Sequence, residues 1–174
     1  MIAGEDRPVE IREIRDDEAD ALGALTVAVY EAIGATEGGT YVEQLRDVRG
    51  RMETCMVLVA VDDGRVVGGA AYVPGPGGPW ADLCTEDEAE FRMLVVDPDH
   101  QGRGIGEALV RRCVDLAVDA GKARLVLLSN HMMVAAHRLY ERLGFVRAPE
   151  RDWFISDDVD LRCFVLTIHH PPRG

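Results

Sequence analysis

The sequence has no long apolar segment and no surplus of positive charge. Its longest strictly apolar run, residues 55–61, is far shorter than the roughly 20 residues that a transmembrane helix needs. Acidic residues outnumber basic ones by 31 to 19, which gives a net charge of −12. Phosphate backbones and anionic lipids attract clustered cations, so this balance argues against nonspecific binding to nucleic acids or membranes. The first residues lack a basic flank followed by an apolar stretch, so we expect no secretory signal and a cytoplasmic protein.

The sequence also has few cysteines, and their spacing forms no known metal or redox motif. The four are Cys55, Cys84, Cys113 and Cys163. No two of them form a C-x-x-C pair, and no histidine lies at metal-ligand spacing from them. We therefore expect no metal site, and four reduced thiols that are mostly buried.

The length of 174 residues and the hydrophobic pattern predict a single α/β domain over residues 1–174. Alternating and continuous apolar runs predict strands over 9–14, 55–61, 66–73, 89–96, 124–128, 145–147 and 161–168. Amphipathic periodicity predicts helices over 17–33, 41–52, 105–120 and 132–143, with an irregular stretch between 147 and 161. Gly121 is expected to end the third helix, and a turn over 62–64 joins two strands as a hairpin.

Positive charge is concentrated in one part of this acidic chain. Residues 101–147 contain eight basic and four acidic side chains. Such a segment suggests a small anionic ligand, although solvated helix faces could produce the same pattern.

The segment from Leu94 to Gly106 joins a strand to a helix through a glycine-rich turn. Unpaired N–H groups at a helix start, together with the helix dipole, can bind a phosphate, and glycines let it approach the backbone. No Gly-Lys-Ser/Thr follows, so the turn is not a P-loop, and Glu107 stands where a dinucleotide fingerprint needs its third glycine. Two interpretations remain open from the residues alone: an anion site, or a tight turn without a ligand.

Two motifs in this region resemble those of the GNAT superfamily of N-acetyltransferases. Gln101-Gly102-Arg103-Gly104-Ile105-Gly106 is similar to the Gln/Arg-x-x-Gly-x-Gly/Ala signature of that family. Downstream, Ala136-His137-Arg138-Leu139-Tyr140-Glu141-Arg142-Leu143-Gly144-Phe145 resembles its A-x-x-L-Y-x-x-x-G-F helix and following strand. The two motifs occur in the family's order, with one predicted helix and one predicted strand between them.

The resemblance implies a GNAT-like α/β fold with a mixed, splayed, twisted β-sheet flanked by helices. The sheet would open between the strand ending at Val96 and the strand ending at Leu128. Coenzyme A, carrying an acetyl group, would lie in that opening, with its pyrophosphate on the glycine turn and its pantetheine arm pairing with the strand edge. The implied cofactor-binding residues are Leu94, Val95, Val96, Gln101, Gly102, Arg103, Gly104, Ile105, Gly106, Met133, Ala136 and Tyr140.

The resemblance also assigns chemical roles. Tyr140 would donate a proton or a hydrogen bond to the departing thiolate, although a tyrosine on an amphipathic helix can also be a core residue. Glu90, expected on the same face as Arg92, Leu94 and Val96, would be the base that deprotonates the amine. His137 and His100 are rival bases. The Val96 N–H would stabilise the oxyanion.

Other basic residues and one departure from the family pattern complete the implied site. Arg103, Arg138 and Arg142 could reach the phosphates, whereas Arg111 and Arg112 are more typical of a solvated helix face. Many relatives have an asparagine seven residues before the tyrosine, and this chain has Met133 there.

We therefore predict an acetyl-CoA-dependent N-acetyltransferase that works by direct attack of a small-molecule or protein amine in one ternary complex, without a cysteine nucleophile. A non-catalytic acyl-CoA-binding or sensor module is the alternative. Residues 74–90 contain five acidic and no basic side chains, so we expect a cationic acceptor, unless these acids are only solvated. The acyl chain length and the oligomeric state, a homodimer included, remain open.

Overall fold

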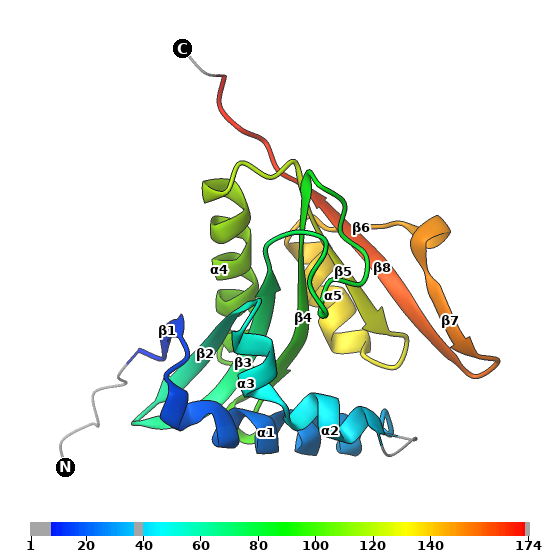
Figure 1. Ribbon diagram of the computed structural model, residues 1–174. Coiled ribbons are helices and arrows are strands. Elements are labelled where there is room, and N and C mark those ends of the chain that lie inside the picture. Colours follow the sequence, from blue (N-terminus) through cyan, green and yellow to red (C-terminus); the bar gives the residue numbers. More distant parts are fainter. Residues whose placement is uncertain (1–7, 37–39, 173–174) are drawn as a thin grey trace.

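A computed structural model of the chain describes residues 8–36 and 40–172; the N-terminal residues that carry the signal-peptide prediction lie outside this part. Its elements form one sheet with helices on both faces (Figure 1). In chain order they are β1 (Glu10–Glu13), η1 (Asp16–Glu18), α1 (Ala19–Ala32), α2 (Thr40–Arg46), α3 (Val48–Met52), β2 (Met56–Asp62), β3 (Arg65–Val73), β4 (Glu88–Val96), η2 (Pro98–His100), α4 (Ile105–Asp119), β5 (Arg124–Asn130), α5 (Val134–Arg142), β6 (Val146–Arg147), η3 (Pro149–Arg151), β7 (Trp153–Ser156) and β8 (Val159–Thr167).

The strand order in the sheet is β1-β2-β3-β4-β5-β8-β6, and β7 pairs with β8 beyond this path. Every pairing is antiparallel except that of β4 with β5, which is parallel. A parallel pair needs a crossover connection, and α4 provides it. This mixed sheet with flanking helices confirms the predicted fold class.

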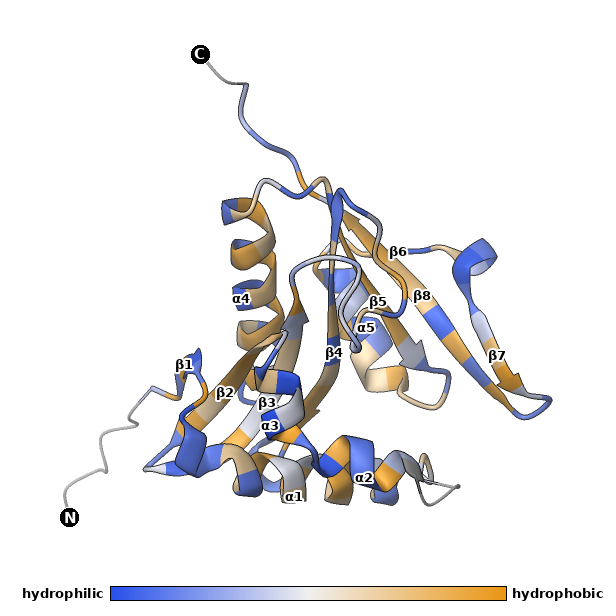
Figure 2. Cartoon of the chain, in the orientation of Figure 1, coloured by the Kyte–Doolittle hydropathy of each residue, from blue (hydrophilic) through white to orange (hydrophobic). Residues whose placement is uncertain are grey.

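The two faces of the sheet are covered by different helices. Leu109 of α4 and Tyr140 of α5 pack with sheet residues such as Phe91 in the largest buried cluster. Leu22 of α1 and Val48 of α3 pack against the other side of the sheet. The apolar strands between these layers are visible in Figure 2. We refer below to the α4–α5 face and the α1–α3 face.

A bulge in β4 changes which side chains point to each face. Gly69 pairs with Val95 and Ala71 with Arg92, so β4 has one residue more than β3 at this point, and Met93 has a φ of +54°. Before the bulge, Phe91 packs on the α4–α5 face; after it, Leu94 does. The expectation that Glu90 shares a face with Leu94 and Val96 is therefore wrong, because an extra residue reverses the alternation.

The parallel pair β4–β5 is short, and the sheet opens beyond it. Pairing is confined to residues 88–90 of β4 and 124–126 of β5. Figure 1 shows the strands together at these residues and diverging toward the Val96 end of β4. The predicted splay is thus present.

Two local predictions were wrong. The helix expected over 41–52 is divided at Asp47, whose carboxylate accepts a hydrogen bond from the Gly50 N–H (2.8 Å) and caps α3. The stretch expected to be irregular contains β7, which pairs with the start of β8.

Candidate functional site

The glycine turn lies where β4 ends and α4 begins. Gly102 and Gly104 both have a φ of +78°, a conformation that side chains rarely adopt, and Gly104 is the N-cap of α4. Both glycines are exposed, whereas Ile105 is buried and anchors the helix start. The first N–H groups of α4 therefore face an accessible turn, as an anion site requires.

Two contacts fix the glycine turn to its surroundings. Arg103 donates through Nη1 to the Asp62 carboxylate at 2.7 Å, so the side chain expected to reach a phosphate is engaged with the end of β2. A Cβ added at Gly106 would lie 3.4 Å from Leu139, so this glycine allows α4 and α5 to approach closely. Gly106 thus joins the two predicted motifs in space.

The edge of β4 next to the opening is free of β5. The Asp97 N–H donates to the Val67 carbonyl of β3 at 2.8 Å. Because successive N–H groups of a strand point to opposite edges, the Val96 N–H points toward β5, into the opening. Leu94 and Val96 pack on the α4–α5 face, while the Val95 side chain is buried against α1.

Tyr140 packs against β4 and β8 on the α4–α5 face. Its ring lies 5.8 Å from that of Phe91 on β4 and 5.4 Å from that of Phe164 on β8. Only 3% of the residue is exposed, and burial raises the pKa of its hydroxyl well above the ordinary value. A buried, neutral phenol next to the open strand edge can donate a proton or a hydrogen bond.

The remaining residues expected at the cofactor lie on α5 and the loop before it. Met133 is the N-cap of α5 and is partly buried, and Ala136 packs against the core. The Asn130 amide oxygen accepts from the Met132 N–H at 2.9 Å, which holds this loop. Gln101 is exposed at the start of the turn.

Glu90 lies on the α1–α3 face, where it holds a loop. Its Oε2 accepts hydrogen bonds from the N–H groups of Asp82, Leu83 and Cys84 at 3.2, 3.0 and 3.3 Å. The residue is 1% exposed, and burial raises its pKa. Its role as the base stays a prediction, since a carboxylate with these three donors already has a structural function.

Arg92 is a partly buried positive charge on the α1–α3 face of β4. Its Nη1 donates to the Trp80 carbonyl (2.8 Å) and contacts the Asp82 carboxylate (2.6 Å). The guanidinium groups of Arg92 and the buried Arg51 lie over the Trp80 ring, 5.5 and 5.6 Å from its centroid. Nε and Nη2 of Arg92 make no hydrogen bond to any described residue. The N–H groups on these two nitrogens can therefore donate to a further anion.

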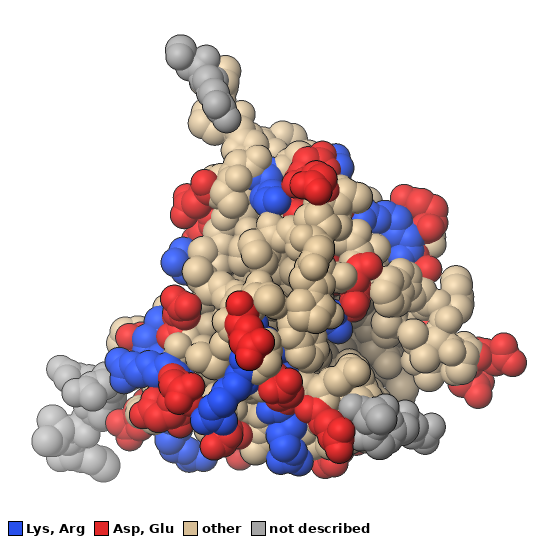
Figure 3. Space-filling view, in the orientation of Figure 1, with Lys and Arg blue, Asp and Glu red and all other residues tan. Residues whose placement is uncertain are grey.

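Most of the acidic side chains in residues 74–90 are held by neighbouring groups, and the cationic acceptor expected from this run stays a prediction. Asp82 contacts Arg92, Asp87 contacts Arg124, and Glu90 binds backbone N–H groups. Figure 3 shows acidic and basic side chains interspersed rather than gathered on one anionic face. Charges neutralised by neighbours steer a cation poorly.

The buried Glu88 lies at the end of β4 that pairs with β5, where it forms ion pairs with Arg124 and Arg151. Its oxygens accept from Arg124 Nε at 2.8 Å and from Arg151 at 2.9 Å. These hydrogen bonds outweigh burial and lower the pKa of Glu88 to about 2. The ion pairs therefore fix the point from which the two strands diverge.

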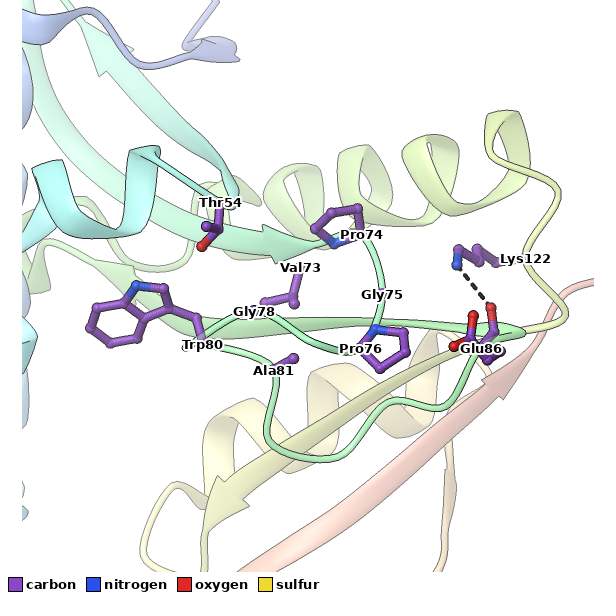
Figure 4. A pocket seen from close by; sticks show the side chains of 10 residues that line it. All are labelled: Thr54, Val73, Pro74, Gly75, Pro76, Gly78, Trp80, Ala81, Glu86 and Lys122. Carbon is purple, nitrogen blue, oxygen red and sulfur yellow. Dashed lines mark hydrogen bonds between the residues drawn. The ribbon is translucent and has the colours of Figure 1, made fainter.

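A pocket of about 500 Å³ lies on the α1–α3 face beside the loop of residues 74–79, which is rich in proline and glycine. Figure 4 shows Trp80 at one end and Lys122 at the other, where Lys122 Nζ donates to the Glu86 carbonyl at 3.0 Å. The pocket thus runs from the paired end of β4 to the tryptophan beside Arg92.

The structure confirms the prediction that the four thiols are buried. All four cysteines are buried and unpaired. Within residues 8–36 and 40–172, no group of three or more His, Cys, Asp or Glu side chains could hold a metal ion. In the same part of the chain, no helix has the length and apolar character to cross a bilayer.

Comparisons with known proteins agree with this geometry. The chain is 34% identical over 90 residues to the L-amino acid N-acyltransferase MnaT of Escherichia coli K12, covering 52% of this chain and 49% of that protein. It is 37% identical over 120 residues to human N-acetylaspartate synthetase, covering 66% of this chain and 37% of that protein. The chain thus spans half or less of the length of these two curated relatives.

Solved structures described as acetyltransferases have a similar fold. The Salmonella typhimurium acetyltransferase yncA, whose structure contains acetyl-CoA, superposes with a TM-score of 0.67 at 23% identity over 95% of this chain and 96% of that one. A GNAT-family structure from Desulfovibrio desulfuricans gives a TM-score of 0.73 at 20% identity, covering 92% and 99% of the two chains. The family model described as "Acetyltransferase (GNAT) family" matches residues 19–145, and the chain belongs to this family.

Proposed function

We propose that the protein transfers an acetyl group from acetyl-CoA to a primary amine by direct attack within one ternary complex. The observation that carries this proposal is the opening between β4 and β5. Near it lie the β4 edge at Val96, whose N–H points away from β3, and a helix start with two positive-φ glycines. The buried Tyr140 packs in the same core cluster as Val96 and Ile105. These are the parts needed to hold an acylated thiol and to stabilise charge on its carbonyl oxygen.

The residues of the α4–α5 face fit the acyl donor. The N–H groups after Gly104 would hold the pyrophosphate, and the backbone of Leu94, Val95 and Val96 would pair with the pantetheine arm as an added strand. Met133 and Ala136 would form the opposite wall. When bound, acetyl-CoA supplies the activated acyl group; Tyr140 supplies a proton donor at the sulfur.

The acceptor would enter from the α1–α3 face. Arg92 provides a partly buried guanidinium with unused N–H groups, stacked on Trp80, and such a fork matches a carboxylate. The named activities of the E. coli and human relatives also involve amino-acid acceptors. We therefore favour an amine that carries a carboxylate over the cationic acceptor expected from the acidic run. A cytoplasmic location and a homodimer stay predictions.

The experiment is a thiol-release assay with acetyl-CoA and matched amines. Each amino acid is compared with its decarboxylated amine and with a polyamine, and N-acetylated product is identified by mass spectrometry. We expect thiol and product in equal amounts, with the highest kcat/KM for an amine that bears a carboxylate. Binding of coenzyme A by calorimetry without turnover of any amine would favour the non-catalytic module, and binding of ATP in its place would favour a nucleotide site.

A further inference from the structure

We propose that β7 forms the interface of a two-fold dimer, in which its outer edge pairs with the same edge of a second copy of this chain. The inference goes beyond the proposed acetyl transfer and does not depend on it. It concerns the surface formed by Trp153, Phe154 and Ile155, which we call the β7 patch.

Only one edge of β7 is paired within the chain. β7 is attached to the sheet through β8 alone, with Trp153 opposite Leu161 and Phe154 opposite Asp160. Within residues 8–36 and 40–172, no backbone hydrogen bond reaches the outer edge of β7. Figure 1 shows the β7–β8 hairpin projecting from the body of the sheet, with no helix beyond it. Free N–H and C=O groups along a strand are a template for pairing with another strand.

The β7 patch is apolar and exposed. The exposed fractions are 38% for Trp153, 78% for Phe154 and 62% for Ile155. The described residues include seven exposed large apolar side chains, and three of them are consecutive on this short strand. Because neighbouring residues of a strand point to opposite faces, both sides of the hairpin present apolar groups. An apolar patch of this kind marks a surface that another protein covers.

The opposite edge of the sheet shows how this chain protects a strand that stays uncovered. β1 reads Glu-Ile-Arg-Glu, and Arg12 is held there by Glu18 at 2.7 Å. Charged side chains on an edge strand discourage pairing with another chain. β7 reads Trp-Phe-Ile-Ser and contains no charge, and the bulge between Phe154 and Ser156 adds none. β7 therefore lacks the protection that β1 has, as expected for an edge that is covered in the assembled protein.

The charges at the two ends of β7 favour a second copy as the partner. Asp157 and Asp158 form the exposed tip of the hairpin, and Arg151 lies just before β7. Arg151 donates through Nη1 and Nη2 to Glu88 and the Leu83 carbonyl, while its Nε makes no hydrogen bond to any described residue. In an antiparallel pair about a two-fold axis through β7, the acidic tip of each copy lies at the Arg151 end of the other. The Nε–H group can then donate to a carboxylate of that tip.

The same geometry limits the assembly to two copies. A two-fold contact uses the same surface of both chains, and the apolar patches of the two strands meet at its centre. β7 has one edge available, and the pair occupies it in both copies. The sheet becomes continuous across the dimer, and no third copy can join at this edge.

The first test is the oligomeric state, measured by size-exclusion chromatography with light scattering. We expect the parent to have the mass of two chains. Phe154→Asp puts a charge at the centre of the contact and should raise the dissociation constant about 100-fold, as loss of a central aromatic residue does. Circular dichroism should stay parent-like, because this side chain is 78% exposed. Val118→Asp, at an exposed apolar residue of α4, is the matched control and should leave the dimer unchanged.

The second test locates the contact by hydrogen exchange. The amides of residues 153–156 should be protected in the dimer and should exchange faster on dilution and in Phe154→Asp. Ile155→Lys provides a second variant if Phe154→Asp does not fold. A parent that is monomeric at about 100 μM, a hundredfold above a micromolar dissociation constant, would overturn the proposal whether or not the protein transfers acetyl groups. A dimer that persists in the charged variants, with the β7 amides unprotected, would overturn it as well.

Discussion

Glu90 and Leu94 belong to the same strand but point to opposite faces of the sheet, because the bulge at Met93 lies between them. The two halves of β4 therefore present their side chains to different faces of the sheet. Its first half presents Glu90 and Arg92 to the α1–α3 face, and its second half presents Leu94 and Val96 to the α4–α5 face. The opening toward β5 connects the two sides, so an acyl donor and an acceptor can meet from opposite faces.

Gly104→Glu should abolish binding of coenzyme A. The position has a φ of +78° and open space around it, so the change strains the turn and places a negative charge where a pyrophosphate would contact N–H groups. Calorimetry measures the loss. Gly121→Glu is the matched control, since it also has a positive φ and open space but lies after α4. Parent-like affinity of Gly104→Glu would place the cradle elsewhere.

Tyr140→Phe should lower kcat by about 10- to 10⁴-fold, the range reported for removing a group that transfers protons. Affinity for coenzyme A should change little, because the ring keeps its packing against Phe91 and Phe164. Pre-steady-state and steady-state rates across pH provide the measurement. If kcat is unaltered at every pH, Tyr140 is only a packing residue.

Glu90→Gln distinguishes a base from a loop anchor. The amide keeps the shape of the side chain but weakens the hydrogen bonds to residues 82–84, so we expect a uniform loss of rate across pH and a higher KM for the acceptor. A loss confined to neutral pH and rescued at high pH, where free amine is abundant, would instead identify Glu90 as the base.

Arg92→Lys should raise KM for an amine that carries a carboxylate by about 10-fold, because lysine cannot make the paired hydrogen bonds of a guanidinium. KM for the decarboxylated amine should not change. Arg111→Lys, on the exposed face of α4, is the control. Equal effects on both amines would show that Arg92 only holds Trp80 and Asp82 in place.

Glu88→Gln should destabilise the fold by about 3 kcal/mol, because it leaves the guanidinium groups of Arg124 and Arg151 without their buried anion. The sign of the pH dependence follows from the pKa of Glu88, which is about 2 in the folded protein against 4.5 ordinarily. Its stabilisation is present above pH 4.5 and is lost as pH falls toward 2. Urea unfolding of both proteins at several pH values tests this: their difference should shrink on acidification. A constant difference would assign the effect to packing.

The glycine turn and the helix after it were predictable because they depend on local chemistry, whereas the mixed sheet and the place of Tyr140 followed from the family resemblance. Asp63 and Gly64, with φ of +47° and +77°, form the expected hairpin turn for the same reason. The bulge at Met93 has no local signal, since its sequence reads as a regular strand, and it reversed the face assigned to Leu94. The break at Asp47 was missed because the apolar pattern continues across it, and the only local sign of a new helix is a residue type that can cap one.

The relations between distant residues were beyond sequence reasoning. The acidic run suggested a steering surface, but pairing of Asp82 with Arg92 and of Glu88 with Arg124 and Arg151 depends on contacts across the sheet.

The most direct test of the account is one reaction of the purified parent protein with acetyl-CoA and an amino acid. Thiol release and N-acetylated product are measured in the same sample. Tyr140→Phe is run in parallel, with Ser156→Ala, at an exposed serine of β7, as the control. We predict equal amounts of thiol and product in the parent and in Ser156→Ala, and a strongly reduced rate in Tyr140→Phe. Binding of coenzyme A with no acetylated product from any amine would contradict the account.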